Sequence, residues 1–130
     1  MKPIQVTGKR KRAVARATLR SGKGIIRINQ FNLRLYKPDM ARMRIEEPLA
    51  IVGDVASKVD IDVNVNGGGI HGQTEAVRLV IGKALAEYDK KLKKQLLSYD
   101  RHLLVADVRR KEQRKPNDSK ARKARQKSYR

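Results

Sequence analysis

The residues whose types and spacing could support chemistry lie between an expected strand and an expected helix, in the segment Gly67-Gly68-Gly69-Ile70-His71-Gly72. This spacing matches G-x-G-x-x-G, which in dinucleotide-binding folds lets the backbone approach a pyrophosphate at a helix N-terminus. The remainder of that fingerprint is missing, because the sequence has no series of alternating strands and helices and no acidic strand end about 20 residues further on. A Walker-type loop is excluded because no Gly-Lys-Ser/Thr occurs. The segment could still receive another anion, or could be a purely structural turn.

Catalysis and metal binding have little support among the other candidates. The two histidines, His71 and His102, have no Ser or Cys in a nucleophile motif beside them, and the chain has no cysteine. Asp60 and Asp62 share one face of an expected strand, where pairing with an arginine is more ordinary than metal binding. The arginines that could pair with them are Arg16 and Arg27. We therefore expect no catalytic residue, no metal and no cofactor, and we interpret the chain as a binding protein rather than an enzyme.

Net charge is the strongest signal in the sequence. The 130 residues carry 32 Lys+Arg against 13 Asp+Glu, a formal net charge of +19. Residues 1–23 have a net charge of +8, residues 24–108 only +2, and residues 109–130 +9. Clusters of cations at both ends predict a polyanionic partner, and nucleic acid fits best because each Lys or Arg placed on a phosphate releases counterions. For the Gly-rich segment, an RNA phosphate is then a better candidate than a dinucleotide.

The first basic cluster contains the run Lys9-Arg10-Lys11-Arg12, which has no acid nearby. A solvated face is the alternative, but phosphate contact is favoured. The predicted RNA-binding residues outside the C-terminal segment are Lys9, Arg10, Lys11, Arg12, Arg16, Gly67, Gly68, Gly69, His71 and Gly72.

The second basic cluster is the C-terminal segment 109–130, which we predict to be an extended tail following a globular domain of residues 1–108. Beyond Val108 the chain has no Leu, Ile, Val, Phe or Met, so this segment cannot offset the entropy of ordering by itself. We expect an arm that orders on RNA; a nonspecific basic tail or a localisation signal is the alternative. The RNA-binding residues expected here are Arg109, Arg110, Lys111, Arg114, Lys115, Lys120, Arg122, Lys123 and Arg125.

Several classes of protein are disfavoured by composition. No apolar run approaches the roughly 18 residues of a transmembrane helix, and the first residues lack the apolar region of a signal peptide, so we expect a soluble intracellular protein without a membrane partner. Aromatic residues make up only 4%, which argues against binding through rows of stacked bases.

The elements that must position these residues follow from apolar periodicity. Alternation predicts strands over 13–19 and 25–28, joined as an antiparallel hairpin, and a third strand over 59–66. Helical spacing predicts a helix over 73–88, followed by a short helix that Asp89 caps and that extends through Leu97. Two short helices are expected earlier, over 40–45 and from Glu46-Glu47-Pro48 onward, and 103–106 is either a last strand or an extended segment on the core. This order predicts an α+β two-layer sandwich.

Four ordered motifs resemble the family of small-subunit ribosomal protein uS9. They are TGKRKRAVA at 7–15, the strand ending GGG with Gly72-Gln73 and Ala76, SYDR and LLVAD at 98–107 followed by RRKE, and QKSYR at 126–130. The match covers essentially the whole chain. The LLVAD segment and the ending are more similar to archaeal or eukaryotic members than to bacterial ones, and the short N-terminus favours archaeal.

The resemblance implies more than composition does. It implies the properties of the uS9 family: an α+β fold of the kind found in the second domain of ribosomal protein uS5, binding of small-subunit rRNA in the head, and a C-terminal tail that extends to the peptidyl-site tRNA. It implies tRNA contact by Lys127, Ser128, Tyr129 and Arg130, head proteins as neighbours, and a place in the cytoplasmic ribosome. Bacterial members commonly end Ser-Lys-Arg, so Tyr129 departs from that pattern. In the Gly-rich loop, Ile70-His71 likewise replaces a basic Lys-Ser.

Overall fold

The computed structural model describes residues 2–109 and residue 113. Its strands are β1 (Ile4–Arg10), β2 (Ala13–Ser21), β3 (Ile26–Ile28), β4 (Phe31–Asn32) and β5 (Val59–Asn66). Its α-helices are α1 (Asp39–Val52), α2 (Ile70–Tyr88) and α3 (Lys90–Tyr99), with 3-10 turns at Leu33–Leu35, Gly53–Lys58 and Arg101–Leu103. Among the helices of this described part, none combines the length and apolar character needed to cross a bilayer.

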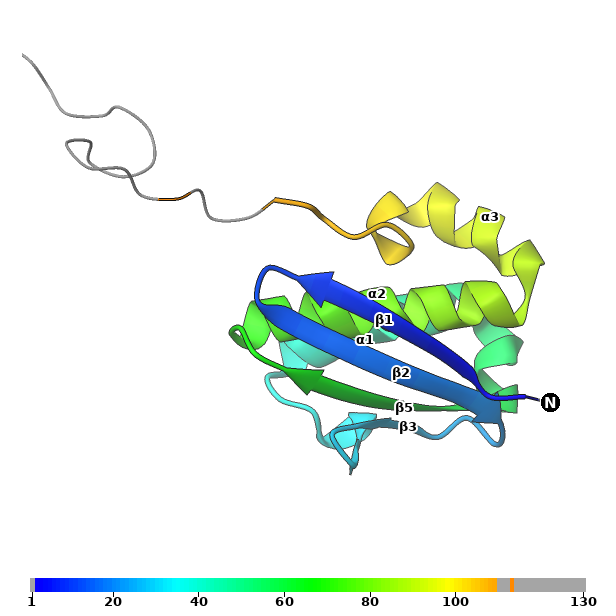
Figure 1. Ribbon diagram of the computed structural model, residues 1–130. Coiled ribbons are helices and arrows are strands. Elements are labelled where there is room, and N and C mark those ends of the chain that lie inside the picture. The colour runs from blue at the N-terminus through cyan, green and yellow to red at the C-terminus, as the bar shows by residue number, and fades with distance from the viewer. Residues whose placement is uncertain (1, 110–112, 114–130) are drawn as a thin grey trace, which may run out of the picture.

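The sheet has the strand order β1-β2-β5-β3-β4. β2 pairs antiparallel with both β1 and β5, whereas β3 runs parallel to β5. Figure 1 shows α1 and α2 on one side of this sheet, and no α-helix of the described residues on the other side. The predicted α+β two-layer sandwich is confirmed.

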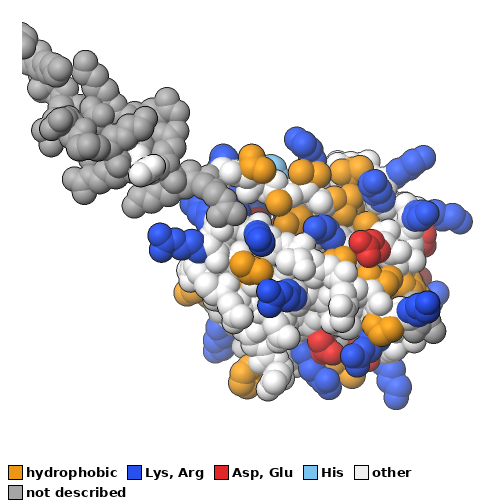
Figure 2. All heavy atoms as spheres, viewed as in Figure 1, with side chains coloured by type: hydrophobic (Ala, Val, Ile, Leu, Met, Phe, Trp, Pro, Cys, Tyr) orange, Lys and Arg blue, Asp and Glu red, His pale blue; other side chains and the backbone are white. Residues whose placement is uncertain are grey.

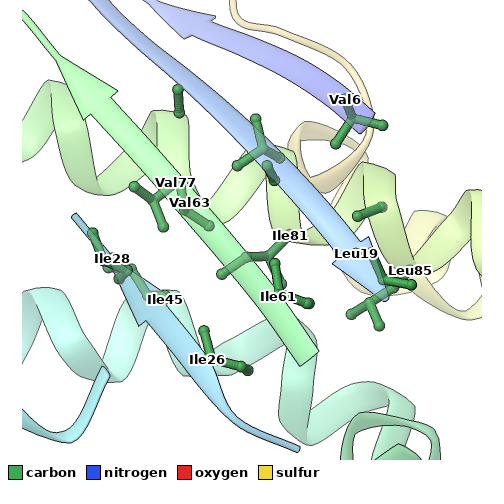
Figure 3. Packing of buried hydrophobic residues seen from close by; sticks show 14 of the residues in the cluster. Val6, Leu19, Ile26, Ile28, Ile45, Ile61, Val63, Val77, Ile81 and Leu85 are labelled. Atoms are coloured by element: carbon green, nitrogen blue, oxygen red, sulfur yellow. The ribbon is translucent and has the colours of Figure 1, made fainter. Parts of the chain in front are cut away.

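The core lies between the sheet and the two long helices. Alternate residues of β2 and β5 are buried, which is why both strands show a period of two in the sequence. Ala15, Ala17 and Val63 of the sheet pack with Val77 and Ile81 of α2 in one cluster of buried side chains. Figure 3 shows α2 and the apolar side chains that meet across this layer.

The expected hairpin between 13–19 and 25–28 is wrong, because β5 lies between β2 and β3. The connection after β2 passes around the start of β5, where one carboxylate oxygen of Asp60 accepts the backbone N–H groups of Lys23, Gly24 and Ile25 at 2.9, 3.1 and 2.9 Å. These bonds lower the pKa of Asp60, with the N–H of Ile25 contributing most. Asp60 therefore organises a turn and is not held by either of the arginines that the sequence suggested.

β1 was not predicted from the sequence. Its inward positions include Gly8, where a Cβ atom would lie 2.8 Å from Cγ1 of Val80 in α2. Because glycine contributes nothing to an apolar period and the strand ends in Lys9-Arg10, the alternation is hidden. The edge strand nevertheless pairs with β2 along its whole length.

The helices differ from expectation at two places. The two short helices expected over 40–45 and from Glu46 onward form one helix, α1, with Pro48 inside it. Pro48 is buried on the apolar stripe that also contains Ala41, Ile45 and Val52, and this packing outweighs the missing N–H. Helix α2 starts at Ile70 rather than near Gln73.

The C-terminal part of the described chain settles two further expectations. Asp89 caps α3 as predicted, accepting the N–H of Lys91 at 3.0 Å. Residues 103–106 form no strand. Instead Leu103 ends a 3-10 turn and is fully buried, whereas Val105 and Ala106 are exposed. Docking on the core is therefore correct for Leu103, but the segment is a turn and not extended.

Candidate nucleic-acid interface

One end of the sandwich collects three segments that are far apart in the sequence. They are residues 9–12 at the end of β1 and in the β1–β2 turn, residues 67–72 of the Gly-rich segment and residues 100–109 after α3. We call this surface the basic end. All three border a cavity of about 310 Å³. Its lining residues are Lys9, Arg10, Lys11, Arg44, His71, Gly72, Glu75, Leu79, Asp100, His102, Asp107 and Arg109. The structure thus brings predicted residues from both basic clusters and the Gly-rich segment to one place.

The first two glycines of the Gly-rich segment pack against the β1–β2 turn. Gly67 has φ of +77° and Gly68 of +66°, a left-handed region that favours glycine. A Cβ atom at Gly67 would lie 2.6 Å from the carbonyl oxygen of Arg12, and one at Gly68 would lie 3.1 Å from the nitrogen of Ala13. The structural alternative therefore accounts for these two residues, whose contact with RNA stays a prediction.

Gly69 differs from these two glycines because a Cβ atom there would meet nothing within 4 Å. It is the N-cap of α2 and provides no side-chain cap, so the first turn of α2 begins without a side-chain acceptor and without an acidic residue. Its carbonyl oxygen accepts the N–H of Gln73 at 2.9 Å. Among the glycines at 67–72, Gly69 is thus the one where an added side chain would enter open space, and it lies at the helix end whose first N–H groups have no partner within the helix.

The predicted basic run does not act as one uniform patch. Lys9, Lys11 and Arg12 are exposed, and the two-residue turn gives Lys11 a positive φ of 54°. Arg10 is different, because its Nη1 lies 2.8 Å from Oδ2 of Asp107 and its side chain is only 20% exposed. Arg16 lies away from the cavity. It is on the side of the sheet that faces away from α1 and α2, in register with Thr7 and Asn64.

Asp107 also holds Arg109. The Nη2 and Nε atoms of Arg109 donate to Asp107 Oδ2 at 2.6 and 2.9 Å, and the backbone N–H of Arg109 donates to Oδ1 at 3.0 Å. The guanidinium of Arg109 and its N–H, together with Arg10, hold the pKa of Asp107 far below its usual range. Arg10 and Arg109 therefore have a partner within the protein, and Asp107 joins β1 to the last residues described.

The two histidines lie at the basic end without forming a catalytic arrangement. His71 is exposed in the first turn of α2, and His102 is exposed in the last 3-10 turn. Asp100 accepts the backbone N–H of His102 at 2.9 Å, whereas the ring Nδ1 of His102 lies 3.3 Å from the carbonyl oxygen of Val105. Within the described residues, no group of three or more His, Cys, Asp or Glu could hold a metal ion.

Arg78 is a structurally important residue that the sequence reasoning missed. Its side chain is only 2% exposed, and its Nη2 lies 2.7 Å from Glu47 Oε2 and 3.1 Å from Asp100 Oδ2. It therefore connects α1, α2 and the turn that leads to the C-terminal segment. The available signal was an arginine within the apolar run of α2, between Val77 and Leu79.

Asp100 and Gly82 complete the attachment of that turn. Burial opposes ionisation of Asp100, but the hydrogen bonds from the N–H of His102 and from Arg78 outweigh it and lower its pKa. On α2, a Cβ atom at Gly82 would lie 2.3 Å from the carbonyl oxygen of Leu103, so only glycine allows this close approach. Both features position the start of the C-terminal segment beside β1.

Most of the predicted tail lies outside the described residues. The residues concerned are Arg110, Lys111, Arg114, Lys115, Lys120, Arg122, Lys123, Arg125, Lys127, Ser128, Tyr129 and Arg130.

A small α+β domain with Lys and Arg gathered at one end has the charge distribution that is typical of nucleic-acid-binding proteins. Residues 8–130 match the model of the family described as ribosomal protein S9/S16. Two relatives, both named small ribosomal subunit protein uS9 and both from strains of Methanococcus maripaludis, are 47% identical over 134 aligned residues that cover all of both chains. The chain therefore belongs to the ribosomal protein S9/S16 family.

Family membership confirms several sequence-based expectations. The chain is a structural constituent of the small ribosomal subunit, of archaeal type, and belongs to the cytoplasmic ribosome. Its family is one of structural proteins, which agrees with the interpretation that it is not an enzyme.

Proposed function

We propose that this protein binds small-subunit rRNA through the basic end and the segment 109–130, as a globular domain of residues 1–108 with an RNA-binding arm. The convergence of residues 9–12, 67–72 and 100–109 around one cavity supports the proposal. The three acids on that cavity each have an arginine partner: Arg44 pairs with Glu75, Arg78 with Asp100, and Arg10 and Arg109 with Asp107. Because these carboxylates are neutralised within the protein, they oppose a phosphate less than isolated carboxylates would.

The exposed cations of the turn would supply the sequence-independent part of this binding. Lys9 at the end of β1 and Arg12 in the turn are exposed and have no acidic partner among the described residues. Removing one cation from a phosphate should reduce the slope of log affinity against log salt by about 0.9 or less. Changing both residues to Ala should therefore weaken binding to the small-subunit rRNA transcript and flatten its salt dependence.

The matched control replaces Lys90 and Lys93 with Ala, which removes the same amount of charge from exposed positions on helix α3. Binding should then change much less. Equal reductions of affinity in the two double variants would mean that only net charge matters, and would contradict the proposed interface at the basic end.

The last residues, Lys127, Ser128, Tyr129 and Arg130, would approach the tRNA bound in the peptidyl site. The full-length match to the relatives and the high positive charge of the segment support this part of the proposal. Deleting Ser128 to Arg130 should leave the protein in the small subunit but weaken retention of peptidyl-site tRNA. Unchanged tRNA retention in such subunits would contradict the role of the terminus.

The same charges would suit a free nucleic-acid chaperone or a DNA-binding protein. The ribosomal function predicts that the protein and its neighbouring head proteins sediment with the small subunit in gradients of high salt. Recovery of the protein only in the free fraction or on DNA would favour the alternative.

A further inference from the structure

The side of the sheet that faces away from α1 and α2 has a chemistry of its own. Every second side chain of β1, β2, β3 and β5 points to this side of the sheet, and these side chains are exposed or partly exposed. We call this side the open face. Apart from Lys9, which belongs to the basic end, its residues are Gln5, Thr7, Val14, Arg16, Thr18, Arg20, Arg27, Asp60, Asp62, Asn64 and Asn66. Figure 2, drawn from the same side as Figure 1, shows this face as mostly uncharged polar and backbone atoms with Lys and Arg scattered across it.

Side chains on the open face line up in rows across the strands. Thr7, Arg16 and Asn64 are neighbours in one row, and Thr18, Asp62 and Arg27 are neighbours in the next. A hollow of about 340 Å³ lies beside them, lined by Arg27, Gln30, Asp62, Val63 and Asn64. Cross-strand pairing and the buried apolar layer beneath fix the backbone at these positions, so the spacing of the rows is set before any ligand arrives.

Much of the hydrogen-bonding capacity on this face is not used among the described residues. Among the described residues, the side chains of Arg16, Arg27, Asp62, Asn64 and Asn66 take part in none of the hydrogen bonds or ion pairs of the structure. Asp60 is the exception, because it is occupied by the turn at 23–25. Amides, hydroxyls and guanidinium groups are therefore available to a ligand.

The chemistry of the face favours RNA over a protein partner. The centre of a protein interface is usually apolar and aromatic, but Val14 is the one apolar residue on the open face. The face carries three cations, Arg16, Arg20 and Arg27, and two carboxylates, one of which is already engaged. A weakly positive surface of amides and hydroxyls suits the wide, shallow minor groove of an RNA duplex, whose 2′-hydroxyl groups both donate and accept hydrogen bonds.

We infer that the open face is a second RNA-binding surface, which docks on the minor groove of a double-stranded segment of rRNA through Arg16, Asn64 and Asn66. This inference depends on the proposed rRNA binding but assigns it a different chemistry. The basic end neutralises phosphates, whereas the open face recognises ribose and base edges by hydrogen bonds.

The first test is a photo-cross-linker placed at Asn64 in the full chain, incorporated into assembled small subunits. We expect cross-links to base-paired rRNA nucleotides. Cross-links to a protein would overturn the inference in favour of a protein partner. Absence of any cross-link, while a probe at Arg12 of the basic end does cross-link, would show an unoccupied face and would also overturn it.

The second test compares the neutral double variant N64A/N66A with wild type for binding to the small-subunit rRNA transcript. Affinity should fall about tenfold, as expected when two hydrogen-bonding side chains are removed, while the salt slope stays unchanged because no charge is removed. The matched control is Gln95→Ala, which removes an exposed amide from α3. Hydroxyl-radical footprints should lose ribose protection on one face of a duplex in N64A/N66A only.

These measurements separate the inference from the proposed function. If wild-type protein binds the transcript and K9A/R12A flattens the salt slope, but N64A/N66A binds and protects the RNA as wild type does, only the open-face inference fails. If wild-type protein does not bind the transcript at all, the proposed function fails. Circular dichroism of N64A/N66A checks that the fold is retained, and the cross-linking test does not depend on that variant.

Discussion

Oδ2 of Asp107 lies 2.8 Å from Nη1 of Arg10, so an ion pair joins the start of the C-terminal segment to the end of β1. The same carboxylate binds Arg109. The highly basic chain thus uses one of its few acids to fix the position from which the basic segment departs.

Asp107→Asn should loosen this attachment, because a neutral amide binds two guanidinium groups more weakly than a carboxylate does. We expect trypsin to cleave after Arg109 several-fold faster in the purified full chain. Asp39→Asn is the matched control, since it neutralises an exposed acid that pairs with Arg42 on α1. Equal cleavage rates after Arg109 in wild type and Asp107→Asn would show that the ion pair does not hold this segment.

Arg78→Met should destabilise the fold, because it removes the shared partner of Glu47 and Asp100 while keeping an apolar side chain of similar length. Both acids are about one-third exposed (29% and 32%), so water can reach them and the cost should stay below that of a fully buried pair. We expect a loss of about 1–3 kcal/mol in the free energy of unfolding, measured with urea.

The control for that measurement is Arg44→Met, which removes the arginine partner of Glu75. The side chain of Arg44 is 48% exposed, whereas that of Arg78 is 2% exposed. Its loss should stay within about 1 kcal/mol. An Arg78→Met variant as stable as wild type would indicate that the network is retained for a reason other than stability.

Gly67→Ala should destabilise the protein through its backbone. The residue has φ of +77°, and the added Cβ atom would lie 2.6 Å from the carbonyl oxygen of Arg12. We expect a loss of about 1–3 kcal/mol in the free energy of unfolding. In Gly69→Ala the same methyl group enters open space at φ of −103°, so stability should change by no more than about 0.5 kcal/mol. Equal effects of the two substitutions would contradict the packing role of Gly67.

Acid should destabilise the protein in part through Asp60 and Asp100, whose pKa values are both lowered by hydrogen bonds in the folded state. Carboxyls that bind protons more weakly when folded contribute stability above their unfolded pKa of about 4 and lose it as pH falls through the lower folded-state values. The urea midpoint should therefore decrease below about pH 4. Asp60→Asn should reduce that decrease.

The control for the pH series is Asp54→Asn, at an exposed position whose carboxylate takes part in no hydrogen bond or ion pair among the described residues. Its pH dependence should match that of wild type. If Asp60→Asn keeps the full decrease, the three N–H groups of the turn do not stabilise the ionised carboxylate.

Local patterns in the sequence predicted the elements whose stability depends on one face. Strand β5 was predicted with its observed limits, because Val59, Ile61, Val63 and Val65 alternate with polar residues. Helix α3 was predicted to begin after Asp89 because a short acidic side chain there can accept the N–H of Lys91. Both signals depend on residues at most a few positions apart.

Other elements were missed because distant residues decide them. The expected hairpin between β2 and β3 is wrong because β5 lies between them. Asp60 of β5 accepts the N–H groups of residues 23–25, and these hydrogen bonds join residues more than 30 positions apart in the sequence. Strand β1 was missed because one of its inward positions is Gly8, which gives no apolar signal. Glycine is needed there because a Cβ atom would lie too close to Val80 of α2. Arg78 was passed over because its partners come from α1 and from the turn after α3.

The sequence by itself determined the α+β class, the two basic clusters, the nearly neutral middle and the family motifs, since composition and short-range periodicity do not depend on how the chain folds. Only the tertiary structure decided that residues 9–12, 67–72 and 100–109 share one cavity, and that Arg10 and Arg109 are held by Asp107. It also decided that none of the described helices covers the polar face of the sheet. The physical reason is that sheet order and ion pairing join residues across the whole domain, where no local pattern reports them.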